Sequence, residues 1–394
     1  SDVKIVNILI TFGCVAFYSV LCYIDNRVQK ESERAKKQCP SNNRDRNRIT
    51  GRQVCLIGGN CNMAISIGIN GFGRIGRVAL RIAISRPETF KLCGINARNA
   101  DLDYMVYMIR YDSTFGRFQG ELGTYEHGLI INGQKIPVFT EGDAASIPWG
   151  SCGAEYIIDA TGAFCTAKKA SAHLQGGAKK VIISAPAKDE ETPTFIMGIN
   201  HTGYSKDMSV VSNASCTTNC LAPICKVLED NYGIEYGLMS TIHAATAKQK
   251  VVDSRSLKDW RTGRSAFGNL IPSTTGAAKA ISLVIPSLKD KMSGISYRVP
   301  TTDVSIVDLN VALKESASYE DICKKVKEAS MTYLSGILDY VDDEVVSSDF
   351  IGDSHASIFD ARQGIQVNSH FFKVICFYDN EWGYTSQIFR LIEH

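Results

Sequence analysis

The sequence predicts an α/β protein: a Rossmann-type doubly wound parallel sheet, followed by a catalytic α+β domain with a mainly antiparallel sheet. Short apolar runs alternate with helical segments from about residue 64 to residue 186, which is the pattern of βαβ units. Beyond about residue 236, apolar and polar residues alternate instead, as in strands with one face in water. The 394 residues are enough for two packed domains.

Composition and charge exclude several classes of protein. The net charge is +2, but residues 25–62 carry nine Lys or Arg against four Asp or Glu, and residues 1–24 are neutral. The remaining residues therefore carry a net charge of −3, which argues against a nucleic-acid-binding body. The 13 cysteines are scattered, odd in number and without a Cys-x-x-Cys pair, and no histidine near Cys216 and Cys220 has ligand spacing. We expect no metal site and reduced thiols.

The first 62 residues read as a leader in two parts. Residues 5–24 are largely apolar and, as a helix, would span roughly 30 Å, the length of a signal peptide or a membrane anchor. Residues 25–62 are basic and rich in Asn and Ser, which indicates disorder or a transit peptide. The combination resembles the two-part leaders that send proteins into plastids of secondary origin. A retained anchor through residues 5–24 and a cytosolic location remain alternatives.

A glycine-rich motif follows the first predicted strand, residues 64–70, and precedes an apolar helical run. The glycines allow a tight turn and close approach of the backbone to a pyrophosphate at the helix N-terminus. The position between strand and helix makes the motif specific for a dinucleotide. The candidate cofactor-binding residues here are Gly71, Phe72, Gly73, Arg74, Ile75 and Gly76.

The next predicted strand, residues 90–96, bears on which cofactor is used. An enzyme specific for NAD places an acidic residue about 20 residues beyond the last glycine, on the ribose 2′-hydroxyl. This chain has Ala97 after Asn96 at that place, followed by Arg98, while Asp101 and Asp103 begin the next helix. Loss of the carboxylate removes repulsion of a 2′-phosphate, and Arg98 can pair with it. We therefore expect NADP, with NAD as an alternative or equal cofactor.

The stretch from Ser212 to Cys220 places Cys216 at the start of a predicted helix, among hydroxyl-bearing residues that can cap it. A helix N-terminus favours a thiolate. A β-like segment 27 residues later supplies His243. A cysteine and a histidine brought together in space form a covalent catalyst.

With these residues assembled, the chain from about Met63 onward resembles the phosphorylating glyceraldehyde-3-phosphate dehydrogenases. The resemblance extends over the rest of the chain and includes long, ordered motifs. They are residues 68–77, 111–114, 173–180, 212–220, 275–280, 298–301 and 378–384. The leader at 1–62 falls outside the resemblance. The rest is expected to form an NAD(P)-binding domain at 63–214, a catalytic domain at 215–378 and a C-terminal segment, 379–394, that returns to the NAD(P)-binding domain.

The resemblance also implies roles for single residues. Cys216 attacks the aldehyde carbon, His243 acts as the base, and inorganic phosphate then releases an acyl phosphate from the thioester. Thr246 and Arg298 fall at the substrate phosphate, and Asn380, Thr161 and Ser184 fall on the cofactor side. The site of the attacking phosphate corresponds to Ser215, Thr217, Thr275 and Gly276.

The resemblance further implies a homotetramer, in which residues 248–272 reach the cofactor pocket of a neighbouring subunit. Ser254 and Arg255 on that loop are then candidates to join Arg98 around a 2′-phosphate. Trp260 and Phe267 are expected in the core or in an interface, and His173 in a structural role. Two other functions stay open: an erythrose-4-phosphate dehydrogenase, and an inactive, membrane-tethered binding protein.

Overall fold

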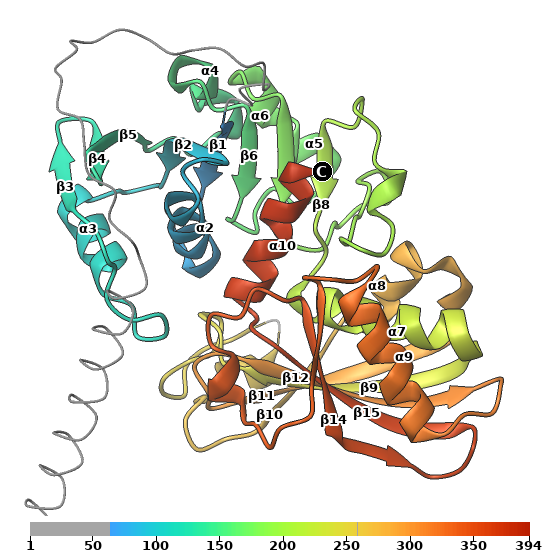
Figure 1. The fold of residues 1–394 in the computed structure, drawn as a ribbon. Coiled ribbons are helices and arrows are strands. Elements are labelled where there is room, and N and C mark those ends of the chain that lie inside the picture. The colour runs from blue at the N-terminus through green and yellow to red at the C-terminus, as the bar shows by residue number, and fades with distance from the viewer. Residues whose placement is uncertain (1–63, 258) are drawn as a thin grey trace, which may run out of the picture. The chain divides into compact units, whose positions relative to one another are not determined.

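Two β-sheets organise the part of the chain that this computed structural model describes, residues 64–257 and 259–394 (Figure 1). The predicted leader, residues 1–62, lies outside the described residues. None of the helices described has both the length and the apolarity that a membrane span requires.

The first sheet has the strand order β3-β4-β5-β2-β1-β6-β7-β8. Its parallel strands are β1 (Ile65–Asn70), β2 (Phe90–Asn96), β5 (Gln134–Phe139), β6 (Tyr156–Asp159), β7 (Lys180–Ile183) and β8 (Val210–Ser212). The antiparallel strands β3 (Leu122–Tyr125) and β4 (Gly128–Ile131) extend one edge.

Successive side chains in these strands point to opposite faces of the sheet, and each face packs in its own apolar core. The strands are therefore apolar throughout. Ile158 and Ile182 pack with α2 (Arg74–Ser85), α3 (Leu102–Arg110) and α10 (Trp382–Glu393). Their neighbours Ile157 and Val181 pack in the second core, with Trp149 and Ala170. The helices of that second face are α4 (Trp149–Cys152), α5 (Ala167–Ala170) and α6 (Ala172–Gln175). Helices on both faces make the sheet doubly wound.

The second sheet has the order β10-β11-β9-β12-β15-β14-β13. Most of its pairs are antiparallel; β11 with β9 and β13 with β14 are parallel. The strands are β9 (Ile234–Ala244), β10 (Ile271–Thr274), β11 (Met292–Val299), β12 (Ser305–Leu313), β13 (Leu338–Val341), β14 (Ser357–Gln366) and β15 (Phe371–Tyr378). The predicted fold class is thus confirmed.

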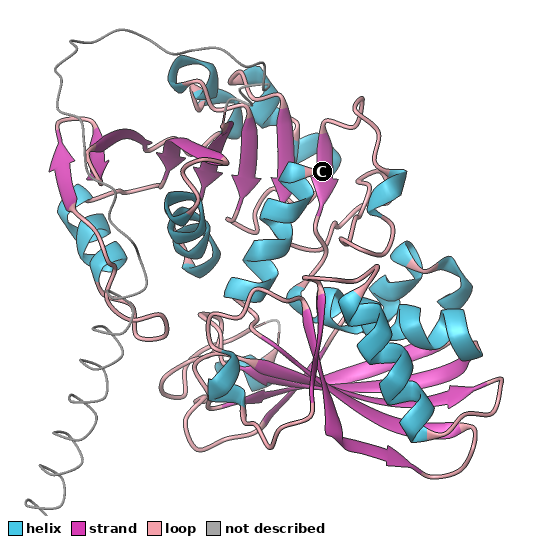
Figure 2. Ribbon diagram, in the orientation of Figure 1, coloured by secondary structure: helices cyan, strands magenta, loops and turns pink. Residues whose placement is uncertain are grey.

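One face of the second sheet is covered by α7 (Cys216–Tyr232), α8 (Ala277–Val284) and α9 (Tyr319–Met331), as Figure 2 shows. Tyr236 and Leu238 of β9 are exposed, so part of the other face is open in the single chain. Five short 3-10 segments lie between these elements: Ala144–Ser146, His201–Gly203, Trp260–Gly263, Pro286–Leu288 and Ser347–Phe350.

Candidate active site

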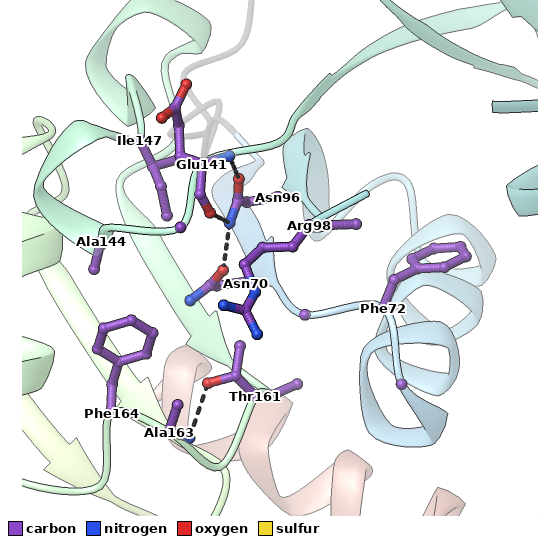
Figure 3. Close-up of a pocket in the computed structure, with 15 residues that line it drawn as sticks. Asn70, Phe72, Asn96, Arg98, Glu141, Ala144, Ile147, Thr161, Ala163 and Phe164 are labelled. Carbon is purple, nitrogen blue, oxygen red and sulfur yellow. Dashed lines mark hydrogen bonds between the residues drawn. The ribbon is translucent and has the colours of Figure 1, made fainter. Parts of the chain in front are cut away.

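A cavity of about 460 Å³ opens at the carboxyl ends of β1, β2 and β6 (Figure 3). The chain leaves β1 for β2 on one side and later returns to β6 on the other, so the strand order reverses here. In open α/β sheets, ligands bind at such a point. Cys216 and His243 are not among the residues that line this cavity.

The three glycines of the motif have distinct steric roles at this cavity. Gly71 has a φ of +102°, which favours glycine. A Cβ on Gly76 would lie 2.0 Å from the carbonyl oxygen of Gly71, so only glycine allows α2 to pack this close to the turn. A Cβ on Gly73 would face open space, and its backbone is free for a ligand to approach. The cradle therefore fits a dinucleotide pyrophosphate.

The motif residues other than glycine make different contacts. Phe72 lines the cavity and Ile75 packs on the apolar core. Arg74 binds two carboxylates instead: its Nη1 lies 2.6 Å from Asp112 and its Nε 2.9 Å from Glu381. Its guanidinium thus ties the start of α2 to the loop before α10.

A buried chain of polar side chains forms the floor of the cavity. Asn96 donates to Asn70 Oδ1 at 2.8 Å, and Asn70 donates to Asp159 Oδ2 at 2.7 Å. Thr161 lines the cavity, and its hydroxyl donates to Asp159 Oδ1 at 2.8 Å. Ser184 does not line the cavity; its hydroxyl donates to the Asp159 carbonyl at 2.8 Å. Sequence reasoning missed Asp159, whose only signal is its place at the end of a buried strand.

His173 belongs to the same hydrogen-bond network and lies beneath the cavity floor. The indole N–H of Trp149 donates to His173 Nδ1 at 3.0 Å, so Nε2 carries the proton and donates to Asp159 Oδ2 at 3.1 Å. His173 is fully buried. The structure therefore gives it a supporting place beneath the cavity rather than a reactive one.

Arg98 follows β2 and lines the cavity beside Ala97. Figure 3 shows its guanidinium extending into the cavity on the side of Asn70 and Thr161, whereas the carboxylate of Glu141 points away. Asp101 caps α3 by accepting from the Tyr104 N–H at 3.0 Å, and Asp103 lies in the first turn of that helix. Neither aspartate lines the cavity.

Cys216 is the first residue of α7, and its Sγ lies 3.5 Å from Nε2 of His243 at the end of β9. Burial raises the pKa of the Cys216 thiol, and the charge of Arg298 counteracts part of that rise. The side chain packs against the cores of both sheets. The structure brings together the two residues that the sequence singled out.

His243 is buried, and the register of β9 and β11 places it opposite Arg298. Burial, helped by Arg298, lowers the pKa of His243 to about 3, so its imidazole is neutral near pH 7. Nδ1 lies 2.8 Å from the Ala244 carbonyl oxygen and 2.5 Å from Arg298 Nη1. Nε2 faces the thiol, and it can act as a base in the tautomer whose proton is on Nδ1 and is donated to Ala244. The Arg298 guanidinium can only donate, so its contact with Nδ1 favours the other tautomer.

Tyr378, which sequence reasoning also missed, fixes the floor behind this pair. Its hydroxyl lies 2.8 Å from Thr217 Oγ1 and 2.9 Å from Thr241 Oγ1. All three side chains are buried. The hydroxyl of Thr217 therefore bonds inside the protein, while its backbone N–H lies in the first turn of α7, where an anion is favoured.

The other predicted phosphate residues lie at helix or turn starts. The hydroxyl of Ser215 caps α7 by accepting from the Thr218 N–H at 3.1 Å. Thr275 accepts from the Ala277 N–H at 3.2 Å, and Gly276 is the N-cap residue of α8. The hydroxyl of Thr246 donates to Gln249 Oε1 at 2.8 Å.

Asn380 is buried beyond the end of β15. Its Oδ1 accepts from the Ser305 hydroxyl at 2.6 Å, and the Ser305 oxygen accepts from the Ala244 N–H at 3.0 Å. The side chain is thereby coupled to the strand that carries His243. With Oδ1 occupied, Nδ2 is the end of the amide that can face a ligand.

Comparison with known proteins identifies the relatives of this arrangement. The family model "Glyceraldehyde 3-phosphate dehydrogenase, NAD binding domain" matches residues 65–167, and "Glyceraldehyde 3-phosphate dehydrogenase, C-terminal domain" matches residues 215–380. The chain belongs to the glyceraldehyde-3-phosphate dehydrogenase family. It is therefore an NAD(P)-dependent oxidoreductase of the phosphorylating class.

Relatives from distant organisms align with this chain over nearly their whole length. "Glyceraldehyde-3-phosphate dehydrogenase 2" of Mucor circinelloides f. lusitanicus is 54% identical over 332 residues, 84% of this chain and 97% of the relative. "Glyceraldehyde-3-phosphate dehydrogenase 1" of Drosophila melanogaster is 55% identical over 328 residues, 83% of this chain and 98% of the relative. The similarity thus extends across both sheets.

The loop at residues 248–272 departs from one expectation. Trp260 is 84% exposed and Phe267 67% exposed, so the core placement is wrong and only the interface placement remains. Ser254 and Arg255 are also exposed, and neither lines the cavity that holds Arg98. Within one chain, the structure does not bring them together.

The described part of the chain also contains cysteines and a group of potential metal ligands. Every cysteine among the described residues is free. Asp339, Asp353 and His355 place potential ligand atoms within 4.8 Å of one another. His355 Nδ1 is, however, already bonded to Asp353 Oδ1 at 2.7 Å.

Proposed function

We propose that this chain oxidises glyceraldehyde 3-phosphate reversibly, with inorganic phosphate, to 1,3-bisphosphoglycerate through a thioester on Cys216. The single observation that carries this is the neutral His243 with Nε2 facing the Cys216 Sγ. A protonated thiol beside a neutral imidazole is poised for proton transfer as sulfur attacks a carbonyl carbon.

The residues then have separate tasks. Sγ of Cys216 bonds to the aldehyde carbon while Nε2 of His243 takes the thiol proton. A bound nicotinamide would accept the hydride that leaves this carbon, and the glycine turn with Asn380 would hold the cofactor. Loss of that hydride leaves a thioester on Cys216. An oxygen of inorganic phosphate then bonds to the thioester carbon, the carbon–sulfur bond breaks, and the acyl phosphate leaves with the Cys216 thiolate regenerated. Arg298, whose Nη1 lies 2.5 Å from His243 Nδ1, would hold the substrate phosphate together with Thr246.

Initial rates of the full chain with the aldehyde, phosphate and either cofactor test the activity. Cys216→Ser should abolish turnover and also the acyl adduct that mass spectrometry detects on the Cys216 peptide when phosphate is withheld. Cys220→Ser is the matched control, since Cys220 is buried one turn further on and contacts Ser357 instead of His243. Equal activity of wild type and Cys216→Ser would refute the thioester.

We propose that NADP is preferred or used as well as NAD. Ala97 supplies no carboxylate to the ribose, and Arg98 places a cation in the cavity. Titration of NAD and NADP with the wild-type enzyme tests this. A specificity constant about tenfold higher for NAD, a difference of ~1.4 kcal/mol, would refute it.

We further propose a homotetramer with a plastid location. The exposed apolar side chains of the 248–272 loop support an interface. The location rests on the composition of residues 1–62 alone. Sedimentation tests the assembly, and a monomer at micromolar concentration would refute it. Residues 1–62 fused to a fluorescent protein test the location in a host with secondary plastids; resistance of the fusion to a carbonate wash would favour a membrane anchor.

A further inference from the structure

Two buried aspartates face each other where the second sheet meets α10. β12 and β15 are antiparallel and pair Ser305 with Tyr378. The residues that precede Ser305 therefore lie beside the residues that follow Tyr378, which brings Asp303 next to Asp379. Asp303 is 4% exposed and Asp379 1% exposed.

The two carboxyl groups have unequal surroundings. Asp379 accepts from three backbone N–H groups: Gly352 at 2.8 Å, Glu381 at 2.9 Å and Trp382 at 2.6 Å. No group in the described part of the chain gives either carboxyl oxygen of Asp303 a hydrogen bond of standard geometry. Three donors stabilise the charge of Asp379, so the proton that the pair shares resides on Asp303.

The charges around Asp303 reinforce this assignment. From the loop before α10, Asp379 and Glu381 both face it with negative charge, while the Val304 N–H acts in the opposite direction. Arg74 of α2 neutralises Glu381 and Asp112. Burial, then Asp379 and Glu381, raise the pKa of Asp303 to about 9, and burial also raises the pKa of Asp379.

We propose that the proton shared by Asp303 and Asp379 positions Asn380 for the cofactor. Asn380 follows Asp379, and its Oδ1 is held by Ser305, two residues after Asp303. The protonated pair lets the two strand ends approach. When the proton is lost, the two carboxylates repel each other and draw Ser305 and Asn380 apart. Asp303 is thus a positioning residue, an inference that rests on the proposed cofactor role of Asn380.

Calorimetric measurement of the NADP and NAD dissociation constants across pH tests the inference without relying on turnover. If only the protonated pair holds Asn380 in place, about one enzyme in ten is competent one pH unit above the pKa. The wild-type dissociation constant should then rise about tenfold between about pH 7 and pH 10. Asp303→Asn keeps the size and donates to Asp379 without a titrating proton, so its dissociation constant should stay within about twofold.

Asp308→Asn is the matched control. Asp308 lies on β12, the strand that follows Asp303, and its carboxylate binds Lys373 instead of another acid. It should keep the wild-type pH profile. The inference is overturned if Asp303→Asn follows the wild-type alkaline profile, or if both proteins bind cofactor equally well at about pH 10.

Thermal unfolding separates this outcome from failure of the proposed function. Between the unfolded pKa near 4 and the folded pKa near 9, the folded protein holds the proton and the unfolded chain does not, so stability falls as pH rises. Asp303→Asn should remove that fall. If the fall is equal in both proteins, the pair shares no proton; if the chain lacks dehydrogenase activity, only the proposed function fails.

Discussion

Exchange of Arg98 for alanine should separate the two cofactors. Arg98 is exposed and does not belong to an apolar core, so the variant should fold normally. A hydrogen bond to a charged group contributes about 1.5–3 kcal/mol, and its loss lowers kcat/KM for NADP about 10- to 150-fold. NAD lacks the 2′-phosphate, so its kcat/KM should change less than about twofold.

The converse change places an acid where NAD-specific enzymes have one. Ala97→Asp should strengthen NAD through the ribose hydroxyl and weaken NADP by repulsion, because Ala97 lines the same cavity. Arg255→Ala should act in the same direction as Arg98→Ala if a neighbouring subunit supplies the loop. Arg264→Ala is the control, since Arg264 lies on that loop and pairs with Asp253 at 2.8 Å.

Steady-state kinetics with each cofactor, at fixed aldehyde and phosphate, give all the specificity constants. Equal losses for NAD and NADP in Arg98→Ala would show that Arg98 contacts a group common to both cofactors. The 2′-phosphate argument would then fail, and the missing carboxylate at Ala97 would have to be explained as tolerated variation in the turn.

Three more variants test the site. His243→Asn should lower kcat by about 10²–10⁴. It should also reduce the loss of stability in acid, because between about pH 6.5 and pH 3 the unfolded chain protonates His243 and the folded protein does not; an unchanged acid melting curve would contradict this. Tyr378→Phe should cost about 1–3 kcal/mol in denaturant unfolding, since two buried hydroxyls lose their shared partner, and no loss would mean that those hydroxyls find other partners. Gly76→Ala should weaken both cofactors or unfold the turn, because its Cβ would lie 2.0 Å from a carbonyl oxygen; normal calorimetric binding would show that α2 can shift.

Elements governed by local pattern could be predicted from the sequence. β2 spans residues 90–96 as expected, and α2 follows the glycine turn, because apolar periodicity and glycine sterics act between near neighbours. The antiparallel strands β3 and β4 were missed, since each has only four residues and contains glycine. The alternation expected beyond about residue 236 corresponds to β9, which ends at Ala244, where the chain turns toward Thr246.

Contacts between distant segments could not be predicted from pattern. The line from Trp149 through His173 and Asp159 to Asn70 joins four separate elements, and no spacing in the sequence relates them. The hydroxyls assigned to phosphate show the same limit. A threonine in a motif can face a ligand or bond inward, and only the structure shows that Thr217 bonds to Tyr378.

Arg298 acts on both Cys216 and His243, and its effects oppose each other. Its positive charge lowers the pKa of Cys216, which favours the thiolate, and also lowers the pKa of His243, which disfavours the imidazolium. Transfer of a proton from sulfur to nitrogen therefore gains little from Arg298, because one half of the ion pair is stabilised and the other is destabilised. Activation of the thiol does not account for a cation at this place. An anionic substrate does, since its phosphate would both bind the guanidinium and reduce the repulsion that keeps His243 from accepting a proton.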